Sequence, residues 1–285
     1  MLTLLSAIEL STEYLNTKNV ESPRLNAELL LAHVLNCKRM DLYLRFDQPL
    51  SDIETDEYRK SIKRRGNREP LQYIVGKVEF FGLDFLVDKR ALIPRPETEI
   101  LVENVLKFAE TIVQPRILDI GSGTGNIAIS LAKNLDNLNI TSIDISQDAI
   151  NLSIKNAELN GLNGNIIFKN IGIDDFELND EAQKFDIIVS NPPYIKLQEY
   201  SNLEIELKYF EPKEALTDFN NGLSFYERIV KKSKSILKTN GMLFFEIGQG
   251  QDLDVVKIME MNNFYNVKTV NDYQNIPRVI YGEIK

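Results

Sequence analysis

Residues 117–126 read Ile117-Leu118-Asp119-Ile120-Gly121-Ser122-Gly123-Thr124-Gly125-Asn126. The stretch predicts a short apolar strand, a glycine-rich turn, and a helix that begins at about Asn126. Glycine tolerates positive φ angles and lets the backbone approach a ligand closely. In a chain of alternating strands and helices, nucleotide-like ligands bind at such a turn. The stretch therefore predicts a nucleotide-binding turn, with an unliganded tight turn as the alternative.

The glycine spacing bears on the kind of ligand. The dinucleotide fingerprint is G-x-G-x-x-G, whereas this loop reads G-x-G-x-G and places Asn126 where the last glycine would fall. Asp119, just before the loop, suits a cationic ligand better than a pyrophosphate. Residues 140–144 predict a second strand that ends in Asp144, whose carboxylate can accept from both ribose hydroxyls. These features favour S-adenosylmethionine, with NAD as the alternative.

A second motif, Asn191-Pro192-Pro193-Tyr194, follows the apolar run 185–189 and Ser190. Proline cannot extend a strand ladder, so the run predicts a buried strand that stops here. Asn191 offers an acceptor oxygen and an amide donor, and Pro192 keeps a free carbonyl. Tyr194 adds a flat aromatic face. Two acceptors and a platform suit the planar NH2 group of an amide or a nucleobase, with a plain strand-ending turn as the alternative.

Together these motifs resemble class I methyltransferases, and more closely the PrmC/HemK family of release factor glutamine methyltransferases. The resemblance spans nearly the whole chain, and the block Leu92–Glu99 combined with Asn191–Tyr194 is its most specific part. The matching blocks are Pro70–Ile74 with Gly76, Leu92–Glu99, Gly121–Gly125, Asp144, Asn191–Tyr194, Glu211–Leu216, Gly222-Leu223, and Phe245–Gly248 with Gln251.

The resemblance implies a Rossmann-like α/β fold with a mostly parallel seven-stranded sheet that ends in an antiparallel hairpin. It also implies a small N-terminal helical bundle and a connecting β-hairpin. The expected domains are 1–70 for substrate recognition, 71–95 as the β-hairpin linker, and 96–285 as the catalytic domain.

The implied reaction transfers a methyl group from S-adenosylmethionine, leaving S-adenosylhomocysteine, to the amide nitrogen of the glutamine in the Gly-Gly-Gln motif of peptide chain release factors. It would support translation termination. Asn191, Pro192 and Tyr194 are the expected catalytic residues, and Pro193 joins them in binding the substrate. The expected cofactor contacts are Gly121, Ser122, Gly123, Thr124, Gly125, Asp144, Gly172 and Asn191.

One region departs from the family pattern. Relatives carry an acidic residue after the third strand, near the adenine, whereas this chain has Asn170 or Ile171 there. Gly172 aligns with the adenine-side contact, so the adenine amine is expected to be held by backbone groups or by Asp174. In the block Leu92–Glu99, some of Glu97, Thr98 and Glu99 are expected to wall the cofactor pocket, with helix capping as the alternative. Arg95 is expected to pin the joint between the domains.

Hydrophobic periodicity predicts the remaining elements. Four helices are expected before about Gly66, the second beginning at Ser22-Pro23, and a hairpin is expected over Gln72–Val87. Segment 196–221 lacks periodicity and is expected to be a lid or substrate loop. Strands are expected near 116–120, 140–144, 165–169, 185–190, 241–247, 266–270 and 279–283, and helices near 97–109, 126–135, 147–160, 223–238 and 252–262.

Composition narrows the function further. The 285 residues carry a net charge of −9, which argues against broad nucleic-acid binding. The cluster Lys60, Lys63, Arg64, Arg65 and Arg68 could touch RNA but reads more simply as a solvated helix face. A single Cys37 excludes an internal disulfide and a cysteine-cluster zinc site, no metal is expected, and the single His33 is expected to be a non-catalytic helix residue.

No stretch reaches the ~20 apolar residues of a membrane span, and no signal peptide is expected, so the cytoplasm is the expected location. A monomer is expected. Two other substrates remain open: a ribosomal protein glutamine, which presents the same amide, and the exocyclic amine of adenine in DNA or RNA. The acidic charge argues against the nucleic acid. A non-catalytic binding module is disfavoured because both motifs are intact.

Overall fold

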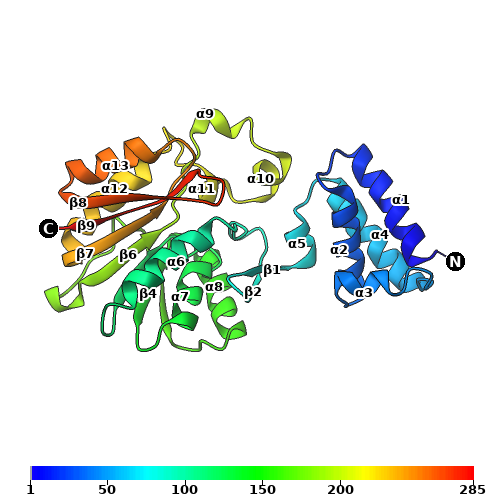
Figure 1. Cartoon of the computed structure of the whole chain (residues 1–285), viewed down its shortest axis with the longest axis horizontal. Coiled ribbons are helices and arrows are strands. Elements are labelled where there is room, and N and C mark those ends of the chain that lie inside the picture. The colour runs from blue at the N-terminus through cyan, green and yellow to red at the C-terminus, as the bar shows by residue number, and fades with distance from the viewer. Residues whose placement is uncertain (1) are drawn as a thin grey trace. The chain divides into compact units, whose positions relative to one another are not determined.

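The structure, a computed structural model, describes residues 2–285. The expected helical domain starts at Met1, which lies outside the described residues. The chain divides into two compact units (Figure 1). The helical unit comprises the residues up to Lys77 together with Glu204–Phe210, and the α/β unit comprises Val78–Leu203 and Glu211–Lys285. Within residues 2–285, no helix is long and apolar enough to cross a bilayer.

The helical unit packs its helices around a small core that includes Leu4, Leu30 and Tyr58. Its helices are α1 (Leu4–Thr17), α2 (Pro23–Val34), α3 (Arg39–Tyr43), α4 (Asp52–Gly66), α5 (Leu71–Val75) and α10 (Ile205–Phe210). Proline at the first helical position begins α2 as predicted, because its missing N–H has no partner to lose there. His33 lies in α2, as expected.

The basic residues near the end of α4 are largely paired with acids. Arg65 and Arg68 both bind the Glu206 carboxylate of α10, at 3.0 and 2.6 Å. Arg64 pairs with Glu69. Three of the five cations therefore have a carboxylate partner, with Glu206 shared by two of them, and Arg65 is buried. This arrangement favours a structural role for the cluster over contact with RNA.

The hairpin expected over Gln72–Val87 starts later than predicted. Residues 71–75 form α5, and the hairpin comprises only β1 (Lys77–Phe80) and β2 (Leu83–Leu86). Gly76 ends α5 in the left-handed conformation at φ 79°, where glycine has no Cβ penalty. The apolar run before it is one helical turn, too short for a helical period to be distinguished from a strand.

The α/β unit is built on a seven-stranded sheet in the order β5-β4-β3-β6-β7-β9-β8. Five strands are parallel and β9 runs antiparallel to both its neighbours, which confirms the predicted sheet and terminal hairpin. The strands are β3 (Arg116–Ile120), β4 (Asn139–Asp144), β5 (Ile166–Asn170), β6 (Phe185–Ser190), β7 (Leu237–Glu246), β8 (Phe264–Asn271) and β9 (Pro277–Ile284).

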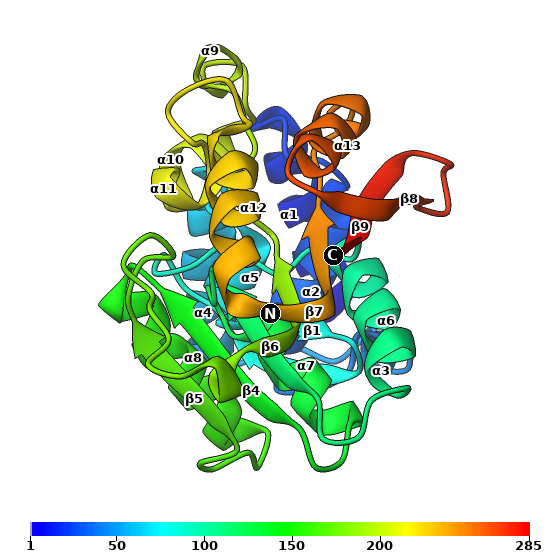
Figure 2. The ribbon, with the colours of Figure 1, turned by 90° about the vertical axis from the view of Figure 1, so that its left-hand side faces the viewer.

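Helices cover both faces of this sheet. One face packs against α6 (Thr98–Ala109), α7 (Asn126–Asn134) and α8 (Gln147–Leu159), and the other packs against α12 (Ser224–Ile236) and α13 (Asp252–Met261). Figure 2 shows α6 and α12 on opposite sides of β7.

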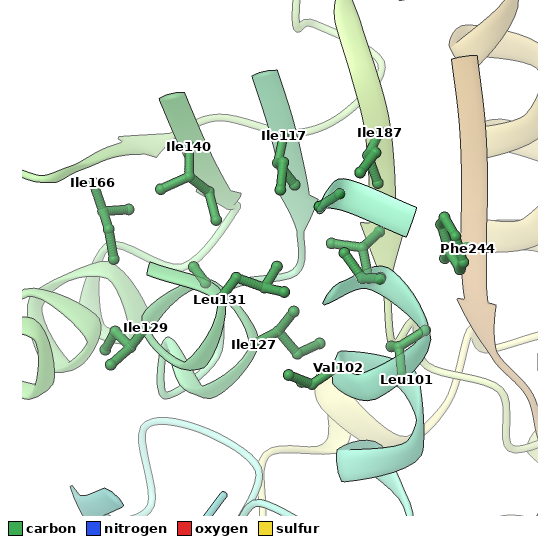
Figure 3. Packing of buried hydrophobic residues seen from close by; sticks show 14 of the residues in the cluster. Leu101, Val102, Ile117, Ile127, Ile129, Leu131, Ile140, Ile166, Ile187 and Phe244 are labelled. Carbon is green, nitrogen blue, oxygen red and sulfur yellow. The ribbon is translucent and has the colours of Figure 1, made fainter. Parts of the chain in front are cut away.

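Figure 3 shows a row of strand side chains, including Ile117, Ile140 and Ile187, directed toward Leu101 of α6 and Leu131 of α7. Burying each such side chain stabilises the fold by roughly 1.5–3 kcal/mol. This packing holds the strand ends that carry the sequence motifs in one place.

The segment 196–221, which lacks periodicity and was expected to be a lid or substrate loop, contains three short helices. They are α9 (Leu197–Tyr200), α10 and α11 (Lys213–Leu216). Outside this segment, before β6, a 3₁₀ turn occupies Glu181–Gln183. Helices of four to six residues are too short to display a 3.6-residue period, so the pattern could not reveal them. A bridge between Ile195 and Thr217 closes the base of the segment.

Candidate functional site

A cavity of about 410 Å³ opens at the carboxyl ends of the parallel strands of the α/β unit. This edge, where the strand order reverses on either side of β3, is the usual ligand site of open α/β sheets. Among the residues that the sequence motifs single out, Gly125 and Tyr194 do not line the cavity. Those that do are Gly121, Ser122, Gly123, Thr124, Asp144, Gly172, Asn191, Pro192 and Pro193.

The glycine loop joins β3 to α7 and is tied down by its own backbone. The N–H groups of Gly121 and Ser122 both donate to the Ile143 carbonyl, at 2.9 and 3.0 Å. Gly125 adopts φ 81°, and a Cβ there would lie 2.9 Å from the Ile129 side chain. Gly125 therefore lets α7 begin close behind the loop. These hydrogen bonds fix the loop in place, and its residues Gly121 to Thr124 line the cavity.

Asp144 ends β4 at the cavity wall. Its carboxylate accepts the Gly123 N–H at 3.0 Å and the Ser146 N–H at 2.8 Å. Burial raises the pKa of the carboxyl, and the backbone donors oppose that shift. The Ile145 backbone also donates to this carboxylate. A carboxylate offers about four lone-pair sites, so Asp144 retains acceptor capacity for a hydroxyl group in the cavity.

Asp119 lies beneath the loop and does not line the cavity. It is fully buried and accepts the Ser142 hydroxyl at 2.7 Å, while its second oxygen has no partner in the described structure. Burial raises its pKa to about 7, with a smaller contribution from Asp144. The sequence suggested that Asp119 faces a cationic ligand, and the structure places it in the core instead.

The far wall of the cavity is apolar. Ile145, Ile171 and Ile173 line it beside Gly172. Asn170 does not line the cavity; its amide donates to the Asp144 and Ile145 carbonyls at 3.0 and 2.8 Å and so ties β5 to the end of β4.

The position proposed for the adenine amine has few charged groups. Asp174 lies outside the lining residues and pairs with Arg228. Arg228 itself lines the cavity, and the Asp175 carboxylate would lie 3.8 Å from a Cβ placed at Gly172. The remaining groups near Gly172 are apolar side chains and backbone atoms, which suits a flat apolar ring with polar edges.

The motif that begins with Asn191 follows β6 beside the glycine loop. Asn191, Pro192 and Pro193 line the cavity, whereas the Tyr194 ring packs against the apolar cluster on the α12 face. Burial raises the pKa of Tyr194 to about 12. Gln251 donates to the Tyr194 carbonyl at 2.9 Å and to that of Gly222 at 3.2 Å. Gln251 thus holds the backbone at the end of the motif. The sequence matched Gln251 to the family but assigned it no role.

Thr98 and Glu246 lie behind Asn191. The sequence predicted that some of Glu97, Thr98 and Glu99 wall the cofactor pocket, but it linked neither Thr98 nor Glu246 to Asn191. Thr98 of α6 lines the cavity, and its hydroxyl donates to Glu246 of β7 at 2.6 Å. The Asn191 amide donates to the Thr98 hydroxyl at 3.2 Å. Burial raises the pKa of Glu246 to about 7, and hydrogen bonds from Thr98 and Asn191 oppose that shift. A lone acid inside the apolar run of β7 was the available signal for Glu246.

The neighbours of Thr98 serve structural purposes. Glu99 accepts the Phe81 N–H at 2.8 Å and so ties α6 to the hairpin. Arg95 pairs with Glu211, whose other oxygen accepts the Ile93 N–H at 3.1 Å. Arg95 was expected to pin the joint between the domains, but both partners of its ion pair lie in the α/β unit, where they join two segments that line the cavity. Glu97 does not line the cavity.

Among residues 2–285, no group of three or more His, Cys, Asp or Glu side chains is placed to hold a metal ion.

The cavity combines the Asp144 carboxylate, the glycine loop, an apolar slot, and the residues Asn191 and Pro192, which carry a side-chain amide and a backbone carbonyl. Such a site can hold a nucleoside with a cationic or uncharged tail and bring an NH2 group to its edge.

Two protein-family profiles match the chain. The family described as the PrmC N-terminal domain matches residues 6–76, and the methyltransferase small domain matches residues 96–211. A release factor glutamine methyltransferase from Fusobacterium nucleatum is 42% identical over 275 residues, which cover 96% of this chain and 77% of that protein. One from Geobacter sulfurreducens is 39% identical over 286 residues, covering 99% and 97%.

Among solved structures, the hMettl16 catalytic domain superposes with a TM-score of 0.54 at 18% identity, covering 82% of this chain and 83% of that one. At that identity the likeness bears on the fold alone. It agrees with the sheet order and with helices on both faces of the α/β unit.

Proposed function

The chain belongs to the release factor glutamine methyltransferase family, and on that premise we propose that it methylates the glutamine amide of the Gly-Gly-Gln motif in peptide chain release factors. The methyl donor is S-adenosylmethionine. The observation that carries the proposal is the placement of Asn191 and Pro192 at the edge of a cavity walled by the glycine loop and Asp144. The substrate is inferred from the named relatives, and the reaction chemistry is inferred from the residues of the site.

The residues present fit the methyl donor. Asp144 has acceptor capacity for a ribose hydroxyl, and the left-handed Gly121 and Gly123 let the backbone approach the ligand tail. Ile145, Ile171 and Ile173 offer an apolar slot for the adenine, with backbone groups near Gly172 for its polar edge. When bound, S-adenosylmethionine supplies an electrophilic methyl group.

The contribution of the chain is to present the weak nucleophile. The Asn191 side-chain oxygen and the Pro192 carbonyl accept hydrogen bonds from the glutamine NH2, which keeps electron density on the nitrogen and aims it into the cavity. Holding two reactants in line can lower a barrier by several kcal/mol, with ~7–11 kcal/mol as the upper range. Aimed dipoles in a site without bulk water add to this. No strong base is needed, because the nitrogen becomes acidic once it is methylated.

We also propose that Tyr194 packs against the amide plane of the substrate. Its ring is half-buried beside the α12 face and does not line the cavity. Its ring position depends on the backbone that Gln251 and Gly222 hold, since a Cβ at Gly222 would lie 2.5 Å from the Tyr194 carbonyl.

We also propose that the helical unit, about residues 1–70, recognises the release factor away from its glutamine, with 71–95 as a linker and 96–285 as the catalytic domain. Support comes from large apolar side chains left exposed on α3 and at its end. Met40 is 67% and Leu44 84% exposed, and they lie four residues apart on one helical face. Exposed apolar side chains grouped in this way are typical of protein-binding surfaces.

The proposed function is tested by mass spectrometry of purified release factor after incubation with the protein and S-adenosylmethionine. We expect one added methyl group on the Gly-Gly-Gln glutamine, and none when that glutamine is replaced by glutamate. A methyl group found only on a ribosomal protein run in parallel would keep the chemistry and change the partner. Transfer to neither protein would refute the proposal and direct the assay to DNA and RNA.

The role of the helical unit is tested with the variant Met40→Ser/Leu44→Ser. We expect a KM for intact release factor raised about tenfold, at an unchanged KM for a short Gly-Gly-Gln peptide. Ile53→Ser on α4, which is also exposed, serves as the control for loss of apolar surface alone. Equal effects on protein and peptide substrates would contradict this role.

A further inference from the structure

Behind the proposed acceptor Asn191 lie two buried polar side chains, Thr98 and Glu246, which come from two separate elements and form a hydrogen-bonded chain with it. Thr98 starts α6 and Glu246 ends β7, and each is only 2% exposed. The Thr98 hydroxyl donates to Glu246 Oε2 at 2.6 Å, and Asn191 Nδ2 donates to Thr98 Oγ1 at 3.2 Å. The Asn191 side chain also hydrogen-bonds Glu246. A buried polar network whose members are hydrogen-bonded to one another holds them in a fixed geometry.

The protons of this network run in one direction. A threonine hydroxyl has a single proton, and Thr98 gives it to Glu246, so toward Asn191 the hydroxyl can only accept. Glu246 is ionised above its pKa of about 7, and in that form its carboxylate can only accept as well. Both neighbours therefore require donors from Asn191, and only its NH2 end supplies them. If the amide turned by 180°, its oxygen would face two acceptors and both hydrogen bonds would be lost.

We propose that Thr98 and Glu246 are positioning residues that hold the Asn191 amide in one of its two orientations, with its oxygen presented to the substrate NH2. The inference rests on the proposed function, since it concerns the same amide acceptor. Neither residue touches the substrate; they act through Asn191. In the opposite orientation Asn191 would meet the substrate NH2 with its own NH2, and donor would face donor.

Thr98 gives the first test. Thr98→Val keeps the shape but removes the hydroxyl, whereas Thr98→Ser keeps the hydroxyl and loses a methyl group. We expect Thr98→Val to lower kcat at least tenfold with the dissociation constant for S-adenosylmethionine within about threefold of wild type, and Thr98→Ser to retain most of kcat. Equal losses in the two variants would mean that Thr98 matters for packing only, and the proposal would be wrong.

Reversing the proton direction gives the sharper test. Glu246→Gln replaces an acceptor oxygen with a donor NH2, which then opposes either the Thr98 proton or the Asn191 NH2. Asn191→Asp offers only acceptors to two neighbours that also accept. In the double variant the new NH2 at position 246 can donate to the new carboxylate at position 191. The outer oxygen of that carboxylate still accepts from the substrate, and the net charge of the cluster is unchanged. We expect each single variant to lose at least tenfold in kcat and the double variant to exceed Asn191→Asp at least tenfold.

Independent losses would refute the proposal, because kcat of the double variant would then equal the product of the two single effects. Circular dichroism and S-adenosylmethionine calorimetry establish that each variant folds and binds the donor. If wild type methylates release factor and the double variant shows no recovery, the orientation proposal fails alone. If wild type methylates nothing, the proposed function fails. The orientation of the Asn191 amide is then tested by solvent exchange of its NH2 protons, which needs no reaction.

The side-chain amide of Asn191 reports its orientation without any reaction. In ¹⁵N-labelled free protein its NH2 resonances, assigned by their loss in Asn191→Asp, should exchange slowly with solvent because both protons are bonded internally. We expect exchange at least tenfold faster in Thr98→Val and near wild type in Thr98→Ser. Fast exchange in wild type would show that the NH2 faces solvent, and the proposal would be overturned.

Discussion

Asp119→Asn is the substitution whose effect the structure specifies most closely. The Asp119 carboxyl is fully buried under the glycine loop, with one hydrogen bond from Ser142 and one oxygen without a partner. Burial disfavours its charged form and raises the pKa from 3.8 to about 7. The folded state therefore holds a proton that the unfolded chain has already released across the pH range between those values.

The magnitude follows from this shift. A group whose pKa is raised on folding contributes stability that is fully present below its unfolded pKa and is lost as the pH rises through its folded pKa. One pKa unit corresponds to about 1.4 kcal/mol. With values of 3.8 and about 7, wild type should lose about 2–3 kcal/mol of unfolding free energy through Asp119 between pH 5 and pH 8. Asparagine does not titrate, so the variant should escape this loss.

The assay is urea unfolding followed by far-UV circular dichroism at pH 5 and pH 8. The difference in unfolding free energy, variant minus wild type, should rise by about 2–3 kcal/mol between the two pH values. Asp136→Asn, which changes an exposed carboxylate, is the matched control and should show no such rise. A difference for Asp119→Asn that stays constant with pH would refute the reasoning from burial.

Three further outcomes follow from the site. Asn191→Ala should lower methyl transfer by at least about 10²-fold, while calorimetry finds S-adenosylmethionine binding largely intact; retained activity would reject the acceptor role. Asp144→Asn should weaken donor binding by about 1–3 kcal/mol, and an unchanged dissociation constant would remove it from the ribose contacts. Gly125→Ala forces a left-handed φ of 81° and a Cβ 2.9 Å from the Ile129 side chain, so thermal unfolding should show a loss of about 1–3 kcal/mol; wild-type stability would mean that the loop relaxes freely.

Local patterns were sufficient for most of the architecture. The strands ending at Ile120, Asp144 and Ser190 were predicted within a residue of their observed ends, because short apolar runs bounded by glycine or proline depend on neighbouring residues alone. The same locality failed where elements were short. The helix Leu71–Val75 and the helices within 196–221 span too few residues to show a period.

What the sequence determined by itself is the order of the sheet strands and the longer helices, the glycine loop, and the motif that begins at Asn191, since each is written in consecutive residues. Only the tertiary structure decided which distant groups support them. Thr98, Asn191 and Glu246 meet although 93 residues separate the first pair and 148 separate Thr98 from Glu246. They meet because β6 lies between β3 and β7 and α6 packs across them, and no local periodicity encodes that adjacency.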